Sequence, residues 1–302
     1  MVILRMNKEY LQTKYNEFGN IKKFATAIGY SPEGARKLLL KNNIEYNKKL
    51  RYNYKKNSFS VVSEHSFYWA GFIAADGNVS NHGDFSFGLQ KQDEKSVFKL
   101  REFLGSNCKI IYRKNFTQIR FRAREIVDDL CINFGIVPNK SLIYKIPQNI
   151  IDNDNFKHFI RGYFDGDGSF SIINNRSRWG FAGTRSTCMD ISSYLHNNLH
   201  LSSQGSIVCR GNYYVLTFYR QFDVYKICSY LYDNSTICLD RKKNICLQSK
   251  RTLDDTNIFS ISKDELQCLY NKYKSRRLVA KNIGCSTSVV GKYINLYDIR
   301  IV

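Results

Sequence analysis

Two segments of this chain, residues 69–77 and 160–168, follow the same nine-residue pattern. Each is an apolar stretch with glycine at its third position and Asp-Gly at its end, and the two aspartates, Asp76 and Asp167, stand 91 residues apart. The apolar stretch predicts a short helix with a carboxylate in its last turn. A pattern that recurs at this spacing predicts two similar half-domains fused in one polypeptide, and therefore a paired site.

The glycines of the pattern indicate how the two helices meet. Because Gly71 and Gly162 have no side chain, another helix backbone can approach closely there, so we expect the two helices to pack against each other. We expect Gly77 and Gly168 to adopt the left-handed conformation that closes a helix. The two aspartates then project at one end, beside carbonyl groups that lack helical partners.

Paired carboxylates at two helix C-termini predict a metal site. Two acidic groups and the negative ends of two helix dipoles repel one another, and a hard divalent cation between them makes the arrangement favourable. Mg²⁺ ions in such a place would serve phosphodiester hydrolysis. An ordinary helix-terminating Asp-Gly turn is the alternative for a single copy. Two copies with the same glycine and the same ending favour the functional interpretation.

The pattern resembles the signature of the LAGLIDADG homing endonucleases, and the resemblance extends over the central two thirds of the chain. It implies an α+β fold, in which a pseudo-two-fold pair of αββαββα half-domains forms a saddle on the major groove of DNA with curved antiparallel sheets. It also implies that Asp76 and Asp167 bind two or three shared Mg²⁺ ions, with help from the carbonyl groups of Ala75 and Gly166. The chain departs from the signature at Ala74, where the second copy has Asp165.

The resemblance further implies basic residues near the scissile phosphates. In the family, a Gln-Lys or similar pair at the end of a strand supplies them, and the matching pairs here are Gln90-Lys91 and Thr184-Arg185. Arginine keeps a charge that can stabilise the transition state but does not readily lose a proton, so we expect the second half to cut more slowly.

Two further lysines are secondary catalytic candidates. They lie in segments late in each half that are similar to the family pattern, at Lys140 and Lys243. An ordinary surface lysine is the alternative at both positions.

The charge of the chain agrees with a nucleic-acid partner. The sequence has 46 Lys and Arg against 26 Asp and Glu, a formal net charge of +20 in 302 residues. Such a surface neutralises phosphates and makes binding dependent on salt. No run approaches the roughly 18 apolar residues of a spanning helix, and residues 1–10 lack a signal-peptide pattern. We expect an intracellular, cytoplasmic monomer with no membrane contact, in a bacterial or phage-infected cell or in an organelle.

The two ends of the chain contain a second repeat. Residues 11–44 align without a gap on residues 266–299, with 10 identities in 34 positions. Each copy predicts three short helices, the last opened by a serine cap, and so resembles a helix-turn-helix reader of DNA. The candidate DNA-binding residues of these end modules are Arg36, Lys37, Lys41 and Lys292. A three-helix bundle that only docks on the central domain is the alternative.

The predicted organisation has five parts. They are helix-turn-helix-like modules at 1–47 and 251–302, a basic linker at 48–62, and half-domains at 63–150 and 151–250. Within the half-domains we expect helices at 94–103, 123–134, 189–199 and 223–231, and hairpins from 110–113 with 117–122 and from 205–210 with 213–219.

Some strand residues are candidates for DNA contact because they alternate with apolar residues. In the first half these are Gln118, Arg120 and Arg122. In the second half they are Tyr213, Thr217, Tyr219 and Arg220. Solvated residues on an open sheet are the alternative.

These observations together predict a Mg²⁺-dependent endonuclease that cuts both strands of a specific double-stranded DNA site. Two other classes stay open at this point. One is a DNA-binding regulator that keeps the fold without cleavage, and the other is a maturase that binds intron RNA by its shape and its 2′-hydroxyl groups.

Overall fold

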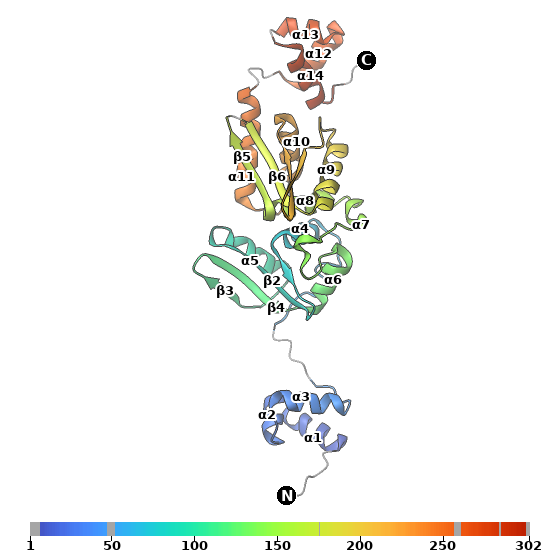
Figure 1. Cartoon of the computed structure of the whole chain (residues 1–302), viewed down its shortest axis with the longest axis vertical. Coiled ribbons are helices and arrows are strands. Elements are labelled where there is room, and N and C mark those ends of the chain that lie inside the picture. Colours follow the sequence, from blue (N-terminus) through green and yellow to red (C-terminus); the bar gives the residue numbers. More distant parts are fainter. Residues whose placement is uncertain (1–6, 47–51, 175, 257–260, 284, 300–302) are drawn as a thin grey trace. The chain divides into compact units, whose positions relative to one another are not determined.

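The computed structural model of the chain describes residues 7–46, 52–174, 176–256, 261–283 and 285–299. They form α-helices and two four-stranded antiparallel sheets, which confirms the α+β class (Figure 1). The chain divides into two compact units, Met1–Arg51 and Tyr52–Val302. In the described residues, no helix combines the length and the hydrophobicity that crossing a membrane requires.

The first unit is a three-helix module. Its helices are α1 (Lys8–Phe18), α2 (Ile21–Ala27) and α3 (Pro32–Lys41). Each begins at a residue whose side chain accepts a backbone N–H of the first turn, namely Asn7, Asn20 and Ser31. Apolar residues from all three helices make its own small core. The serine cap and the three helices agree with the sequence prediction.

The first half-domain contains one helix, two strands, a helix, two strands and a helix. Their bounds are α4 (Glu64–Asp76), β1 (Asn78–Val79), β2 (Asp84–Gln90), α5 (Glu94–Phe103), β3 (Ile110–Arg113), β4 (Phe116–Arg122) and α6 (Arg124–Phe134). The strands pair in the order β1-β2-β4-β3. This is the predicted αββαββα sequence of elements.

The second half-domain repeats that plan. Its elements are α8 (Phe156–Asp167), β5 (Gly168–Ile173), β6 (Arg176–Gly183), α9 (Arg185–Leu199), β7 (Ser206–Arg210), β8 (Tyr213–Phe218) and α10 (Gln221–Tyr232). The strand order β5-β6-β8-β7 matches that of the first sheet. The predicted pseudo-two-fold pair of half-domains is therefore confirmed.

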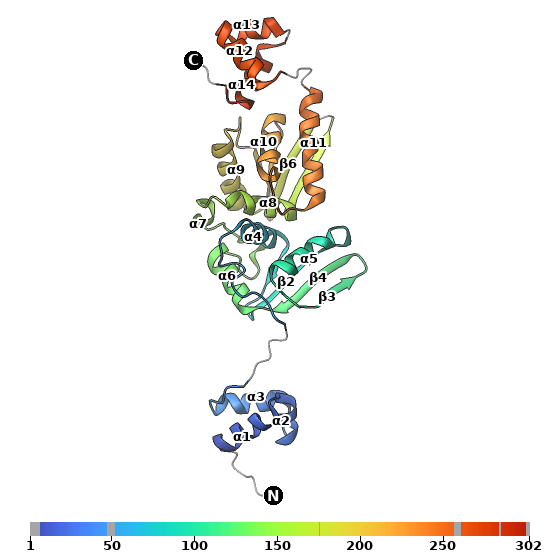
Figure 2. The same cartoon turned by 180° about the vertical axis from the view of Figure 1, so that it is seen from behind.

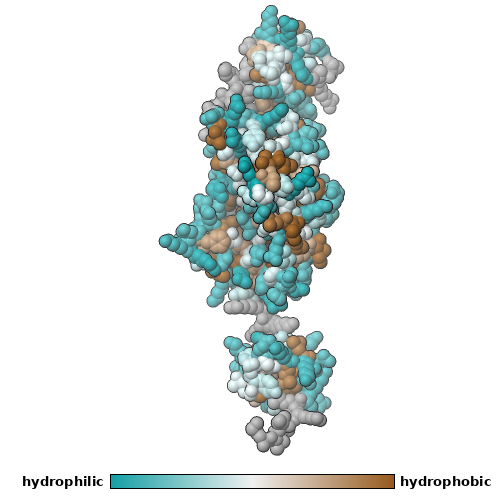
Figure 3. Space-filling view, in the orientation of Figure 1, coloured by the Kyte–Doolittle hydropathy of each residue, from teal (hydrophilic) through white to brown (hydrophobic). Residues whose placement is uncertain are grey.

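Each sheet is covered on one face by helices and open on the other. Along β4, Ile119 and Phe121 are buried while Arg120 and Arg122 are exposed. In the second sheet Leu216 and Phe218 point inward in the same way. The buried residues of both halves join one hydrophobic core, which contains α4 and α8. On the face that Figure 3 shows, hydrophilic residues predominate, with smaller hydrophobic patches between them.

Helices α4 and α8 make a close backbone contact. A Cβ atom built on Gly71 would stand 2.0 Å from the carbonyl oxygen of Phe159, and one built on Gly162 would stand 1.9 Å from that of Tyr68. The two helices thus touch backbone to backbone, at reciprocal positions. This is the packing that the two motif glycines predict.

The prediction for the last glycine of each motif was wrong. Gly77 has φ −81° and ψ 162°, and Gly168 has φ −75° and ψ 151°, so both are extended rather than left-handed. Glycine is needed there for space instead. A Cβ on Gly77 would lie 2.8 Å from the Ile73 oxygen, and one on Gly168 would lie 2.2 Å from the Phe164 oxygen. After each of the two helices, the chain turns sharply at this glycine and enters a strand directly.

The segments outside the half-domains differ from the predicted boundaries. Residues 48–51 of the expected linker lie outside the described residues. The remainder, from Tyr52 on, packs on the first half-domain, where Phe59 is buried and the Lys55 N–H donates to the Leu104 oxygen at 2.8 Å. Apolar side chains in that segment explain why it folds back, because their burial outweighs the solvation of its charges.

Two further helices of the second unit flank the second half-domain. Helix α7 (Gln148–Ile151) lies in the connection to α8, and helix α11 (Asp240–Thr256) packs on α10 and beside β5 and β6 (Figure 2). Helix α11 runs past residue 250, where the second half-domain was expected to end. The C-terminal module then follows, with α12 (Lys263–Tyr273), α13 (Arg276–Ile283) and α14 (Thr287–Leu296) around a core of its own.

A substitution at the helix contact tests its role. We expect Gly71→Ala to lower the free energy of unfolding by about 3 kcal/mol, because the new methyl group meets backbone atoms that cannot turn away. Gly291→Ala, inside α14, is the matched control: the nearest atom to its Cβ is the Arg276 Nη1 atom at 3.9 Å. Urea unfolding measures both. Equal effects of the two changes would contradict a rigid backbone contact at Gly71.

Candidate active site and nucleic-acid interface

The carboxylates of Asp76 and Asp167 lie together at the C-terminal ends of the paired helices. The Asp76 Oδ2 atom is 3.2 Å from the point that a Cβ on Gly166 would occupy. Both aspartate side chains are exposed to solvent, yet protein atoms crowd them. The helix contact therefore carries the two carboxylates to one place, as the sequence predicts.

The two carboxylates repel each other when both are charged. Partial desolvation, followed by repulsion from Asp76, raises the pKa of Asp167 to about 6. Desolvation also raises the pKa of Asp76 above its usual value. The charges of two lysines, Lys140 and Lys242, oppose both shifts. A cation at this position would relieve the repulsion.

The two lysines occupy equivalent places in the two halves. Lys140 Nζ donates to the carbonyl oxygen of Gly77, the residue after Asp76. Lys242 Nζ donates to the carbonyl oxygen of Gly168, the residue after Asp167, and to that of Phe164. Burial lowers the pKa of both ammonium groups, while nearby aspartates oppose that effect. Each carboxylate thus has a buried lysine beside the end of its helix.

Lys242, and not the predicted Lys243, is the lysine that reaches this site. Lys243 Nζ instead donates to Ser235 Oγ at 3.4 Å. The helical period contains the signal that was missed. Lys242 shares a face of α11 with buried Cys246 four residues on, whereas Lys243 shares its face with Leu247, which is 54% exposed.

The other predicted catalytic residues lie where β2 and β6 end. Gln90 ends β2 and Lys91 follows it, while Thr184 and Arg185 follow β6 at the equivalent place in the other half. Gln90, Lys91 and Arg185 are exposed. Thr184 has a structural task, because its hydroxyl caps α9 and donates to the Tyr144 oxygen at 2.6 Å. In the described part of the chain, no hydrogen bond or ion pair joins these residues to the carboxylates.

The second motif carries a buried carboxylate that the first lacks. Asp165 accepts hydrogen bonds from the hydroxyl groups of Tyr68 at 2.8 Å and Tyr232 at 2.5 Å, and from the Leu239 N–H at 2.6 Å. Burial raises the pKa of Asp165 to about 6, although the three donors oppose the rise. Because Leu239 directly precedes α11, the carboxylate fixes the start of the helix that carries Lys242.

A buried arginine of the same motif, Arg161, connects the start of α4 to residues at and after the end of α10. Arg161 Nη2 donates to Glu64 Oε1 at 2.6 Å, and its Nε and Nη1 atoms donate to the carbonyl oxygens of Ile237 and Leu231 at 2.9 and 3.0 Å. The guanidinium thereby joins the first turn of α4 to the chain between α10 and α11. The first motif has Ala70 at the equivalent place.

The open faces of the two sheets carry the predicted DNA-binding strand residues. Arg120 and Arg122 are exposed and Gln118 is half-buried, all on the face opposite Ile119 and Phe121. In the second sheet Tyr213, Thr217 and Tyr219 take that face, opposite the buried residues of β8. The strand pairing adds exposed basic residues that the sequence analysis missed, namely Arg113, Arg178 and Arg210.

No protein-family model and no curated protein matches the chain. Among solved structures, the chain is similar to the LAGLIDADG meganuclease I-CpaMI bound to uncleaved DNA, with 16% identity, 65% of this chain and 92% of that one covered, and a TM-score of 0.46.

Two further solved structures are similar to the same extent. The meganuclease I-SmaMI bound to uncleavable DNA has 15% identity, with 63% and 90% of the two chains covered and a TM-score of 0.47. The LAGLIDADG homing endonuclease I-GzeII in complex with its DNA target has 12% identity, coverage of 65% and 91%, and a TM-score of 0.46.

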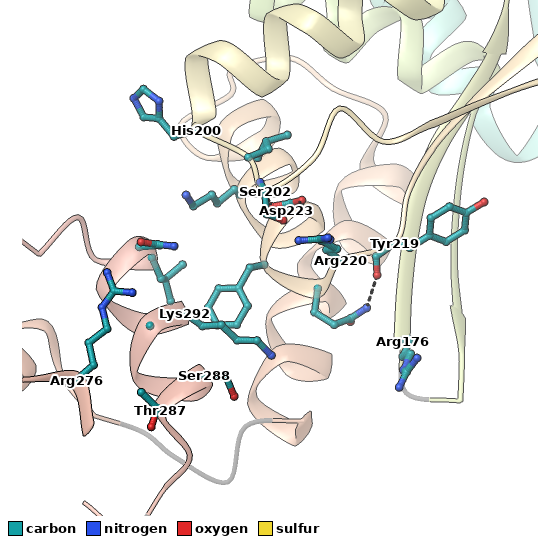
Figure 4. A pocket seen from close by; sticks show the side chains of 17 residues that line it. Arg176, His200, Ser202, Tyr219, Arg220, Asp223, Arg276, Thr287, Ser288 and Lys292 are labelled. Carbon is teal, nitrogen blue, oxygen red and sulfur yellow. Dashed lines mark hydrogen bonds between the residues drawn. The ribbon is translucent and has the colours of Figure 1, made fainter. Parts of the chain in front are cut away.

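The candidate residues of the end modules fall in different settings. On α3, Lys37 and Lys41 are exposed, while Arg36 forms an ion pair with Glu33 at 3.2 Å. On α14, Lys292 lies over the ring of Phe222 from α10, 5.7 Å from its centroid. Lys292 and Arg220 line one groove within the second unit (Figure 4).

Removal of the buried carboxylate tests how α11 is held. We expect Asp165→Ala to lower the free energy of unfolding by about 3 kcal/mol or more, because it leaves two hydroxyl groups and the Leu239 N–H buried without a partner. Tyr232→Phe removes only one donor and should cost about 1 kcal/mol. Chemical denaturation compares the two, and an Asp165→Ala protein as stable as Tyr232→Phe would contradict this role.

Proposed function

We propose that this protein is a site-specific endonuclease that hydrolyses both strands of double-stranded DNA with divalent metal ions, as the resemblance to LAGLIDADG homing endonucleases implies. One observation carries the proposal: two adjacent carboxylates at paired helix ends, each with a buried lysine, lie in a domain that has two open sheet faces. A protein that only binds nucleic acid gains nothing from two repelling carboxylates facing a phosphate surface.

The residues present fit a magnesium site. The donor set consists of the Asp76 and Asp167 carboxylates, with the carbonyl groups of Ala75 and Gly166, and hard cations such as Mg²⁺ prefer oxygen ligands of this kind. Desolvation and, after it, repulsion from Asp76 raise the pKa of Asp167, and a cation would relieve that repulsion. A Mg²⁺ ion held there would supply Lewis-acid chemistry: activation of a water molecule, charge neutralisation at the attacked phosphate and stabilisation of the leaving oxygen.

The chain's own residues supply the remaining chemistry. Lys140 and Lys242 hold positive charge at Nζ beside the place where the scissile phosphates would lie, and their lowered pKa favours exchange of a proton there. Exposed Lys91 and Arg185 add charge at equivalent strand ends. Arg120, Arg122 and Tyr213 are placed on the open faces, where they would position the duplex and contact base edges.

Cleavage of a target plasmid tests the paired site. The target is the uninterrupted junction at the gene's own locus, or a site selected from a randomised plasmid library. We expect linear product from the wild type with Mg²⁺, and a rate lower by about 1000-fold in Asp76→Asn and Asp167→Asn, because each aspartate holds metal. Ca²⁺ in place of Mg²⁺ serves as a binding control. Tight binding without any strand scission would instead indicate a regulator or, with intron RNA as the ligand, a maturase.

Two adjacent lysines provide a matched pair of variants. We expect Lys242→Met to slow cleavage by about 100-fold, because it removes the charge beside Asp167, and Lys243→Met to change the rate by less than about threefold. Strand-resolved gels of end-labelled DNA measure both, and Lys140→Met reports on the other half. A larger defect in Lys243→Met than in Lys242→Met would overturn this assignment.

A further inference from the structure

A basic groove lies at the end of the second sheet that is farthest from the carboxylates. Strand β5 starts at Gly168, directly after Asp167, and ends at Ile173, which pairs with Arg176 of β6. Five residues of extended chain separate the two ends by about 17 Å. Trp179 of β6 pairs with Phe218, so β8 also finishes toward this far end and leads into Tyr219 and Arg220.

The groove begins where the open face of the sheet ends. Arg178 and Tyr219 are exposed there, with the guanidinium 5.5 Å from the centre of the tyrosine ring. Tyr219 and Arg176 also line the groove itself, which has a volume of about 1100 Å³ (Figure 4). A duplex that follows the sheet away from the carboxylates would therefore reach the groove next.

Positive charge dominates the lining of the groove. Five basic residues from both sides contribute, namely Arg176, Arg220, Lys226, Arg276 and Lys292. Among the described residues of the lining, Asp223 is the one acidic residue. It is buried and already accepts hydrogen bonds from the Ser202 N–H at 3.0 Å and hydroxyl at 2.7 Å. In the described part of the chain, Arg176, Arg220 and Arg276 form no ion pair.

The C-terminal module forms the opposite wall. Tyr293 of α14 meets Phe222 of α10 edge-on, with ring centroids 6.1 Å apart, and Lys292 lies over the same phenylalanine ring. Thr287 and Ser288, the first residues of α14, line the groove, so the positive end of the helix dipole adds to its charge. Cations and hydroxyl donors on both walls are suited to a chain of phosphates.

We propose that this groove binds the sugar-phosphate backbone of duplex DNA that extends beyond the second sheet. The inference rests on the proposed function and deepens it, because it gives the C-terminal module a place in target binding. Lys292 and Arg276 both line the groove. In this proposal α14 therefore contacts phosphates and does not read bases. Affinity gained in the groove depends on the length of flanking DNA and not on its sequence.

The experiment compares binding to two target duplexes in Ca²⁺. One ends at the edge of the second half-site, and the other extends about 10 base pairs farther on that side. The wild type should bind the longer duplex about tenfold more tightly, with a steeper salt dependence, since each phosphate contact adds about 0.9 to the slope of log K against log salt. Randomising the flanking sequence should leave that gain unchanged.

Variants locate the gain in the groove. Arg276→Ala with Lys292→Ala should bind the longer duplex only about as tightly as the shorter one, while binding to the shorter duplex stays the same. Lys263→Ala is the control, because this exposed lysine belongs to the same module but does not line the groove.

The outcomes separate this inference from the proposed function. No effect of flanking length, an equal loss in Lys263→Ala, or loss of the gain when the flank is randomised would each overturn the groove assignment. A protein that shows the length-dependent gain but cuts no DNA would uphold the groove and overturn only the nuclease.

Discussion

The backbone contact between α4 and α8 is the interaction on which the rest of the structure depends. Gly71 and Gly162 each face a carbonyl oxygen of the opposite helix at a separation that leaves no room for a methyl group. Helices in such close contact cannot easily slide or rotate against each other, so their C-terminal ends are held side by side. The helix contact therefore determines the position of the two carboxylates. It also places the two sheets on either side of one shared hydrophobic core.

The pseudo-symmetry of the two halves is broken in a specific way. The second motif has Arg161 and Asp165 where the first has Ala70 and Ala74. Both polar side chains are buried, and both hold the chain between α10 and the start of α11. Only the second half continues into such a helix, so only its motif needs these groups. The cost of burying them is offset by the hydrogen bonds that each of them makes.

Two different local structures consequently deliver the same group to the two halves of the site. Lys140 sits in a short 3-10 turn (Lys140–Leu142) preceded by Asn139, which has a positive φ of 57°. Lys242 comes from the first turn of a long helix. Each ammonium group nevertheless ends on the carbonyl of the glycine that follows the aspartate. Equivalent chemistry in the two halves therefore does not require equivalent scaffolds.

The sequence by itself determined the plan of this protein. The repeated glycine and Asp-Gly ending predicted the helix pair and the meeting of Asp76 and Asp167. A glycine can be read directly from the sequence, and its missing side chain marks the place where a second helix can approach closely. Alternation of polar and apolar residues gave β3 and β4 and their exposed faces almost to the residue, since strand period depends on neighbours in the chain. Serine caps likewise predicted the last helices of both end modules.

Only the tertiary structure decided the rest. Gly77 and Gly168 are needed for space against the preceding turn, which cannot be separated from a left-handed cap by reading the residues alone. The choice of Lys242 over Lys243 depends on the rotation of α11, and that rotation is set by Asp165 from a helix more than 70 residues earlier in the chain. The basic groove joins residues of β6, α10 and α14 that no local pattern connects, because burial and proximity between distant segments arise only when the chain has folded.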